Sequence, residues 1–301
     1  MSTRDWIYIV ALGAAFGAVF LINEILLRQL GPLGISFGRV ALGAVAVWVL
    51  VVVLQRPVQM SGMHVVHSAV FGIFMFGLPF ALFPLGQKWI TGGMAGIINA
   101  MTPLAVVVVS QFWPGGERAT LLKFIGVLSG LAGIVILSLP GLSAPESNQT
   151  IGILLVLIAP VSYAVALNYI RKLSEVDIFA LIAVAMTSAA VLLLPLVLLV
   201  EGLPPALTKD SWISLALIGP VFTGWFFLAA LVIMRRVGAT ASSTLTFIAP
   251  ISALLLGAWI LGEEVGVVHI LGMLAIFVGL VFIDGRLIRR VFGTANSQPD
   301  G

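Results

Sequence analysis

Long runs of apolar residues alternate with short polar breaks along the whole chain. Crossing the roughly 30 Å hydrocarbon core of a bilayer takes about 20 apolar residues, and the backbone must be helical because lipid offers its polar groups no partner. The pattern therefore predicts an all-α membrane protein with ten transmembrane helices, separated by breaks that carry proline, glycine or charge. The predicted spans are 6–27, 33–54, 65–88, 92–113, 121–140, 151–171, 177–200, 212–234, 239–261 and 266–285.

The apolar runs occur in two matching series. Pro103 and Pro250 are 147 positions apart, and the pairs Gly126/Gly272 and Gly133/Gly279 are 146 apart. The chain therefore divides into two five-helix repeats, 1–140 and 150–288. Because five is odd, the second repeat enters the membrane upside down, which gives the inverted topology that alternating access requires. The alternative is a repeat kept for packing alone, as in a channel or scaffold.

Composition supports a lipid environment. Of 301 residues, 60% are hydrophobic and 9% charged, and the mean hydropathy is +1.18, whereas soluble domains carry about 25% charged residues. The net charge of +3 does not indicate nucleic-acid binding, because the basic residues lie at the ends of the runs. The chain has no cysteine and three scattered histidines, so we expect no disulfide, metal site or cofactor.

The distribution of Lys and Arg predicts the orientation. On the side of the N-terminus lie eleven of the fifteen: Arg4, Arg56, Arg118, Lys123, Arg171, Lys172, Arg235, Arg236, Arg286, Arg289 and Arg290. The opposite side has Arg28, Lys88 and Lys209, and Arg39 lies inside a span. The positive-inside rule then places both termini in the cytoplasm, as in a bacterial inner-membrane protein. The polar tail, 292–301, is expected to be disordered.

Six motifs in order resemble the EamA-type branch of the drug/metabolite transporter superfamily. They are FG at 16–17, Arg39, TPLAVVVVSQFWPGGE at 102–117, GVLSGLAGIVIL at 126–137, APISALLLGAWILGEE at 249–264 and LGMLAIFVGLVFI at 271–283. The resemblance covers nearly the whole chain. It implies ten helices, a central cavity lined mainly by the first, third, fourth, sixth, eighth and ninth, and movement of small metabolites such as amino acids, often outward.

Two prolines predict where a substrate binds. A proline inside a helix frees the carbonyl four residues earlier, which belongs to Asn99 for Pro103 and to Thr246 for Pro250. We therefore expect hinges at both prolines and a cavity between the fourth and ninth spans, with Thr102 and Ser243 beside them. The alternative is a simple kink whose carbonyl accepts a hydrogen bond from a neighbouring Ser or Thr.

Charged residues inside spans are costly and call for an explanation. Glu24 and Arg39 lie at similar depths in the membrane and are candidates for a buried ion pair. Glu24 is also a candidate for binding the substrate or a proton. The alternative is an ion pair of Glu24 with Arg28 at the end of the helix. Arg39 is a candidate for neutralising a substrate carboxylate or for bracing two helices. Glu263, where the ninth run ends, is interpreted mainly as favouring the start of the tenth helix, as is Glu117 for the fifth.

Other polar and aromatic residues complete the candidate cavity. They are Asn23, Gln87, Tyr163, Asn168 and Trp225. Gln87 and Lys88 are interpreted as part of an exit vestibule, with an interfacial anchor as the alternative for Lys88. The aromatic residues are interpreted as facing either the cavity or the surrounding packing and lipid. The glycine rows 13/17 and 126/130 are expected to let helices of one monomer pack closely, with a dimer contact as the alternative.

Together these features predict a secondary transporter of small metabolites, most simply an exporter, working as a monomer or homodimer with a proton as a candidate coupling ion. A lipid or drug flippase of the same fold is the alternative. An intramembrane enzyme is not favoured, because no acid in the spans is spaced for catalysis with another acid or a histidine. The chain also lacks the GxxxxGK[ST] loop of ATP-driven pumps.

Overall fold

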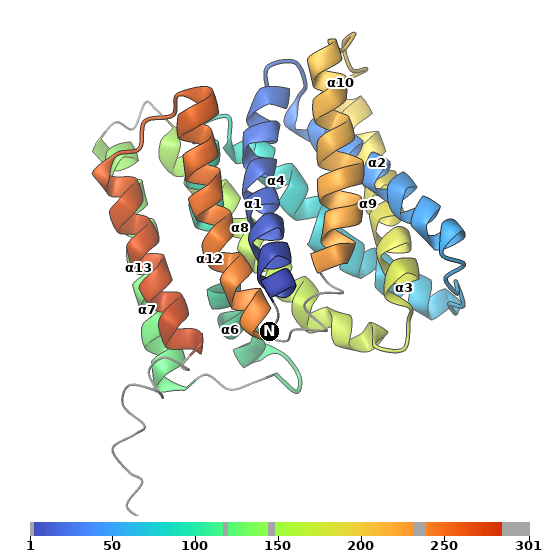
Figure 1. The fold of residues 1–301 in the computed structure, drawn as a ribbon, viewed down its shortest axis with the longest axis horizontal. Coiled ribbons are helices and arrows are strands. Elements are labelled where there is room, and N and C mark those ends of the chain that lie inside the picture. Colours follow the sequence, from blue (N-terminus) through green and yellow to red (C-terminus); the bar gives the residue numbers. More distant parts are fainter. Residues whose placement is uncertain (1–2, 117–119, 144–147, 231–238, 285–301) are drawn as a thin grey trace, which may run out of the picture.

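The computed structural model describes residues 3–116, 120–143, 148–230 and 239–284, which form a bundle of helices (Figure 1). No strand occurs in these ranges. The elements up to residue 143 are α1 (Thr3–Leu26), α2 (Pro32–Val53), α3 (Gly62–Gly72), the π-helix η1 (Ile73–Gly77), α4 (Leu78–Gly86), α5 (Gly92–Asn99), α6 (Thr102–Phe112) and α7 (Leu121–Ser143). The later elements are α8 (Gln149–Tyr169), the 3₁₀ helix η3 (Ile170–Leu173), α9 (Ile178–Val200), α10 (Lys209–Ala216), the π-helix η4 (Leu217–Trp225), α12 (Ala239–Leu256), the π-helix η5 (Gly257–Leu261) and α13 (Val267–Asp284).

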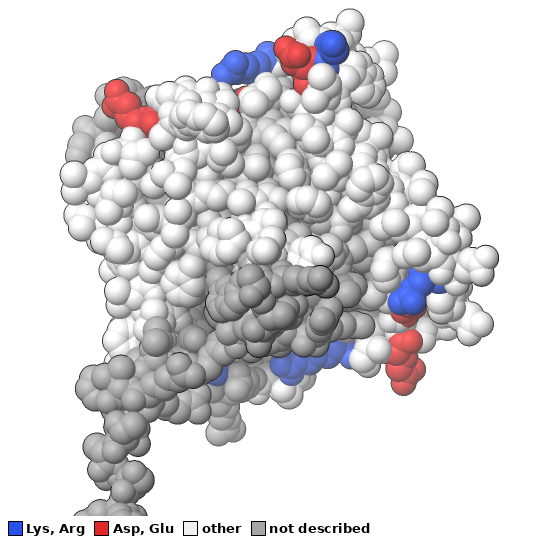
Figure 2. All heavy atoms as spheres, in the orientation of Figure 1, with Lys and Arg blue, Asp and Glu red and all other residues white. Residues whose placement is uncertain are grey.

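The helices have the length and composition of membrane spans. Within the described residues, eight helical segments are long and apolar enough to cross a bilayer, and two more, Phe247–Leu261 and Val267–Ile283, are shorter and apolar. On the face shown in Figure 2, charged side chains lie towards the upper and lower ends, and a broad uncharged band separates them. The all-helical membrane fold is confirmed, and the count of ten spans stays a prediction. Glu117 and the tail 292–301 lie outside the described residues.

Several spans begin at a polar residue that caps the helix. The side chains of Ser61, Thr91 and Thr208 accept hydrogen bonds from backbone N–H groups in the first turns of α3, α5 and α10. Asp177 does the same for α9. Because the first N–H groups of a helix have no partner within it, these caps fix where each span starts.

α7 and α13 pack against each other in opposite directions. A Cβ placed on Gly126 would lie 2.6 Å from the carbonyl oxygen of Gly279, and one on Gly133 would lie 2.7 Å from that of Gly272. Between these contacts, the hydroxyl of Ser129 donates to the carbonyl oxygen of Ala275 at 2.7 Å. Ser129 and Ala275 are 146 positions apart, so each occupies the same place in its own repeat. Residues that meet their own repeat equivalents lie near a two-fold axis, and the antiparallel direction is that of inverted repeats.

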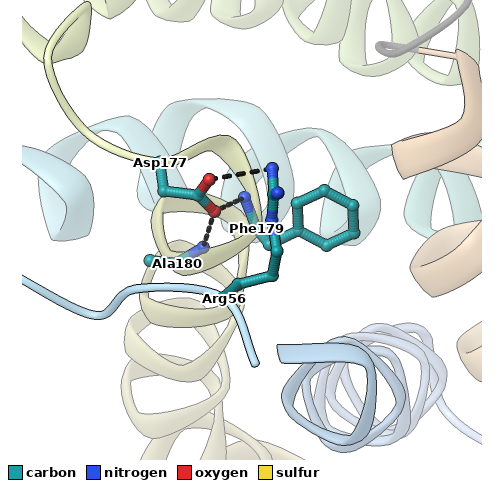
Figure 3. Close-up of polar contacts among 4 residues, drawn as sticks. All are labelled: Arg56, Asp177, Phe179 and Ala180. Carbon is teal, nitrogen blue, oxygen red and sulfur yellow. Dashed lines mark hydrogen bonds and ion pairs between the residues drawn. The ribbon is translucent and has the colours of Figure 1, made fainter. Parts of the chain in front are cut away.

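α2 and α9 are joined at both ends. The carboxylate of Glu201, just after α9, accepts hydrogen bonds from the N–H groups of Leu33 and Gly34 at 2.9 and 2.8 Å, in the first turn of α2. At the other end, Arg56 follows α2 and its guanidinium lies 3.0 Å from Asp177, which caps α9 (Figure 3). A charged residue after the end of α9 thus binds the start of α2, and a charged residue after the end of α2 binds the start of α9. The two helices must therefore run antiparallel.

Two large apolar clusters form the core. One is built mainly on α4, α5, α6 and α8, and the other on α2, α3, α9 and the π-helix η1. Tyr163 of α8 packs against both clusters, so its phenol marks the boundary between them. The polar groups described next lie along the same set of helices.

Candidate functional site

A buried arginine occupies the boundary between α2, α4 and η4. Arg39 lies about two turns into α2 and is 6% exposed. Its Nε donates to the hydroxyl oxygen of Thr223 at 2.7 Å, and its guanidinium carbon lies 3.5 Å from the ring centroid of Phe80. The charge is thus held by one neutral acceptor and by the negative face of one aromatic ring. We call Arg39, Phe80, Thr223 and Tyr163 the arginine cluster.

The partners of Arg39 are themselves fixed in place. The hydroxyl of Thr223 donates to the carbonyl oxygen of Ile218, five residues earlier, at 2.6 Å, inside the π-helix η4. Ser36, one turn before Arg39, places its hydroxyl 2.6 Å from the carbonyl oxygen of Phe80. The backbone of Phe80 and the hydroxyl of Thr223 are therefore each held by a hydrogen bond that does not involve Arg39.

π-Helical stretches occur at matching places in the two repeats. η1 lies in the third predicted span and η4 in the eighth, and an offset of 146 carries residues 73–77 onto 219–223. The wider turns leave carbonyls in need of partners, and the hydroxyl of Ser162 donates to that of Phe74 at 2.7 Å. π-Helices are uncommon and often lie at functional sites. Here η4 carries Thr223 of the arginine cluster, and η1 accepts a hydrogen bond from Ser162, the residue before Tyr163.

A second polar cluster ties together the ends of α1 and α4. The amide nitrogen of Asn23 donates to the side-chain oxygen of Gln87 at 3.1 Å, and the Gln87 nitrogen donates to the carbonyl oxygen of Phe20 at 2.8 Å. Both side chains are buried. Gln87 therefore links α1 to the end of α4, and its role in an exit vestibule stays a prediction.

Two glutamates converge on the first turn of α5. Oε2 of Glu24 and Oε1 of Glu263 both accept from the N–H of Gly92, at 2.9 and 3.0 Å, and Oε2 of Glu263 accepts from Gly93 at 3.0 Å. Gly262 has φ +70°, which turns the chain back after η5, and the carboxylate of Glu263 packs so closely on Gly257 that a side chain there would clash.

Two interpretations of these charges are therefore wrong. Glu24 and Arg39 do not pair, because Glu24 bonds to α5 while Arg39 bonds to η4; the ion pair of Arg56 with Asp177 is the only one within the described residues. Glu263 does bind a helix N-terminus, but that of α5 rather than of α13, because the left-handed turn at Gly262 directs it backwards.

The fourth span breaks at its proline. α5 ends at Asn99 and α6 begins at Thr102, just before Pro103. The freed carbonyl oxygen of Asn99 accepts a hydrogen bond from the hydroxyl of Thr102 at 2.7 Å, as the kink alternative expects. The side-chain oxygen of Asn99 is buried without a partner in the described structure. By contrast, α12 continues through Pro250.

The remaining candidates are spread along the bundle. Asn168 is buried and accepts from the hydroxyl of Ser110 at 2.9 Å, which joins α8 to α6. Trp225, at the end of η4, is 46% exposed. Ser243 and Thr246 lie on α12, but their side chains are outside the described part of the chain.

The sequence did not indicate Thr223, Phe80 or Ser36 as site residues. Phenylalanine and hydroxyl residues are common in apolar runs and carry no signal of their own. The π-helices place Thr223 opposite Arg39, and one extra residue in a turn has no signature in the hydrophobic period. The one available signal was the buried charge itself, which requires neighbours of this kind.

Comparison with known proteins identifies a family. The profile of the EamA-like transporter family matches residues 5–139 and, a second time, residues 150–284. Among similar proteins, an uncharacterized transporter of Bacillus subtilis, YoaV, is 24% identical over 94% of this chain and 97% of its own length. An uncharacterized transporter of Archaeoglobus fulgidus is 23% identical over 93% of this chain and 98% of its own.

Two further matches extend the comparison. The uncharacterized inner membrane transporter YedA of Escherichia coli K12 is 22% identical over 91% of this chain and 88% of its own length. A crystal structure with 18% sequence identity has the same fold, with a TM-score of 0.65 over 96% of this chain and 99% of that chain.

Proposed function

The chain belongs to the EamA-like transporter family, and we propose that it is a secondary transporter that exports small, amino-acid-like metabolites by alternating access. In this proposal it lies in a bacterial inner membrane with both termini in the cytoplasm, as the distribution of basic residues favours. The family and the similar transporters support membrane transport; substrate, direction and mechanism are our inference.

The observation that carries the proposal is the antiparallel contact of α7 with α13. Ser129 meets its repeat equivalent Ala275, and glycine pairs lie on both sides of this contact. Two units related in this way can alternate. The contacts by which one unit closes the transport path at one face of the membrane have equivalents in the other unit at the opposite face. The cavity residues that we propose from sequence, among them Asn99, Tyr163 and Thr246, belong to elements on both sides of this axis.

The described conformation supports a closed outer end. The links between Asn23, Gln87 and Phe20, and those of Glu24 and Glu263 with Gly92, all lie where α1 ends and α5 begins. In the proposed orientation this end faces outwards. Export then requires these bonds to break while the cytoplasmic end closes.

We also propose that the two glutamates take up a proton during this cycle. Two carboxylates that accept from one N–H repel each other unless a proton lies between them. The other charged group that interacts with Glu24 is Arg28, one turn further along. Loss of the proton would favour separation of Glu24 from Glu263 and would loosen the outer end.

The transport experiment uses purified protein in liposomes, loaded with radiolabelled amino acids in one set and a lipophilic cation in another. We expect substrate-specific efflux of amino acids that depends on an imposed pH gradient. Glu24→Gln should remove the dependence on the gradient, while the control Glu264→Gln, at an exposed glutamate, should keep it. Efflux of the cation alone would instead support a drug or lipid flippase.

A further inference from the structure

Arg39 is a buried charge without a counter-ion. No carboxylate lies within 4.0 Å of it in the part of the chain that the structure describes. A charge transferred from water into a protein interior costs several kcal/mol unless it is paired or well hydrogen-bonded. The ring of Phe80 and the hydroxyl of Thr223 compensate only part of this cost.

The two terminal nitrogens of Arg39 remain open. Its one hydrogen bond among the described residues is made by Nε. Among the described residues, the fully buried side-chain atoms without any partner are the amide oxygens of Asn23 and Asn99. The Nη atoms of Arg39 also make no hydrogen bond in this part of the chain but do not belong to that fully buried class, so they retain some exposed surface.

The cluster fixes the orientation of the guanidinium. Thr223 gives its own proton to Ile218, so it can offer only a lone pair to Nε, and this fixes one edge of the guanidinium. Phe80 covers one face of it. The free edge is the planar fork of N–H donors that matches the two oxygens of a carboxylate.

Tyr163 is a second polar group near Arg39, at the boundary of the two apolar clusters. Its ring is tilted against Phe83 with centroids 6.3 Å apart, and its phenol interacts electrostatically with Arg39. The phenol has no hydrogen-bond partner among the described residues and is not among the buried unpartnered atoms. The Tyr163 hydroxyl is therefore a donor near Arg39 that has no partner in the described structure.

We propose that the arginine cluster binds a carboxylate group of the transported metabolite, with Arg39 as a bidentate donor and Tyr163 as an additional donor. This inference rests on the proposed transport function and names its substrate class: metabolites that carry a carboxylate, and not neutral lipids or lipophilic cations. If Arg39 only held helices together, its contacts with Thr223 and the ring of Phe80 would be sufficient. Such a role does not account for the two Nη atoms, which have no partner within the described ranges.

The test compares amino acids with derivatives in which the carboxylate is replaced by an uncharged carboxamide group. Binding of the L-amino acids to the purified protein is measured by calorimetry, and each amino acid that binds is compared with its carboxamide, which has the same shape without the anion. We expect the acid to bind about tenfold or more tightly than the amide. Arg39→Gln should remove this preference by weakening the binding of the acid, and Arg39→Lys should keep part of it.

The control is Arg56→Gln, which removes an arginine from the end of the same helix, where it pairs with Asp177. It should leave the acid-to-amide ratio unchanged. Equal binding of acid and amide to the wild type, or an unchanged ratio in both Arg39 variants, would overturn the carboxylate site alone. Binding of lipophilic cations with no acid bound would overturn the proposed function as well.

Discussion

Gly72 lies where α3 crosses α9 so closely that no side chain fits between the helices. A Cβ at this position would lie 2.7 Å from the carbonyl carbon and 2.8 Å from the Cα of Ala185. Backbone atoms cannot rotate away, so Gly72→Ala should force the helices apart and destabilise the protein by about 1–3 kcal/mol. Thermal unfolding in detergent, followed by gel filtration, measures the effect.

The matched control is Gly62→Ala in the same helix, where a Cβ would meet nothing within 4 Å. It should be neutral or slightly stabilising, because alanine favours a helix over glycine. Equal unfolding temperatures for the two variants would contradict the close contact between α3 and α9.

At the scale of single residues, the sequence indicated which positions are unusual but not what they touch. Arg39 and Glu24 were found because charge inside an apolar run is costly. Their partners, Thr223 and Gly92, are 184 and 68 positions away, and no local pattern predicts such contacts. The glycine rows were interpreted correctly as packing within the monomer, since Gly13 meets Ile248 and Gly126 meets Gly279.

At the scale of elements, the link between α2 and α9 is open to a direct test. Glu201→Ala removes the carboxylate that caps the first turn of α2, and loss of such a cap costs about 1 kcal/mol. We expect a lower unfolding temperature, measured by tryptophan fluorescence. Glu264→Ala, at an exposed glutamate without a hydrogen bond in the described structure, is the control. An equal effect of both substitutions would show that the cap contributes nothing.

Apolar length alone predicted helices across the membrane, since lipid permits no other open structure. Apolar length did not predict where a span breaks or where its helix widens into π-helical turns. The break at Pro103 follows from the missing N–H of proline, whereas α12 continues through Pro250 with the same residue type. The three π-helices of the described residues have no counterpart in the hydrophobic pattern, because a single extra residue in a turn does not change that pattern.

At the scale of the molecule, the repeat could be detected in the sequence because glycines and prolines recur at a nearly constant offset. An odd number of spans in each unit then predicted the inversion, and the antiparallel contacts of α7 with α13 and of α2 with α9 agree with it. The proposed exchange of open and closed ends depends on this inversion more than on any single side chain.

The most direct measurement uses the absence of cysteine from the chain. Val58 and Pro205 are repeat equivalents in exposed breaks after α2 and α9, and each is replaced by cysteine in a separate variant. In intact cells, a membrane-impermeant maleimide should label Pro205→Cys at once and Val58→Cys only after permeabilisation. Labelling of both from the same side would contradict the inverted architecture and, with it, transport by exchange between two opposed halves.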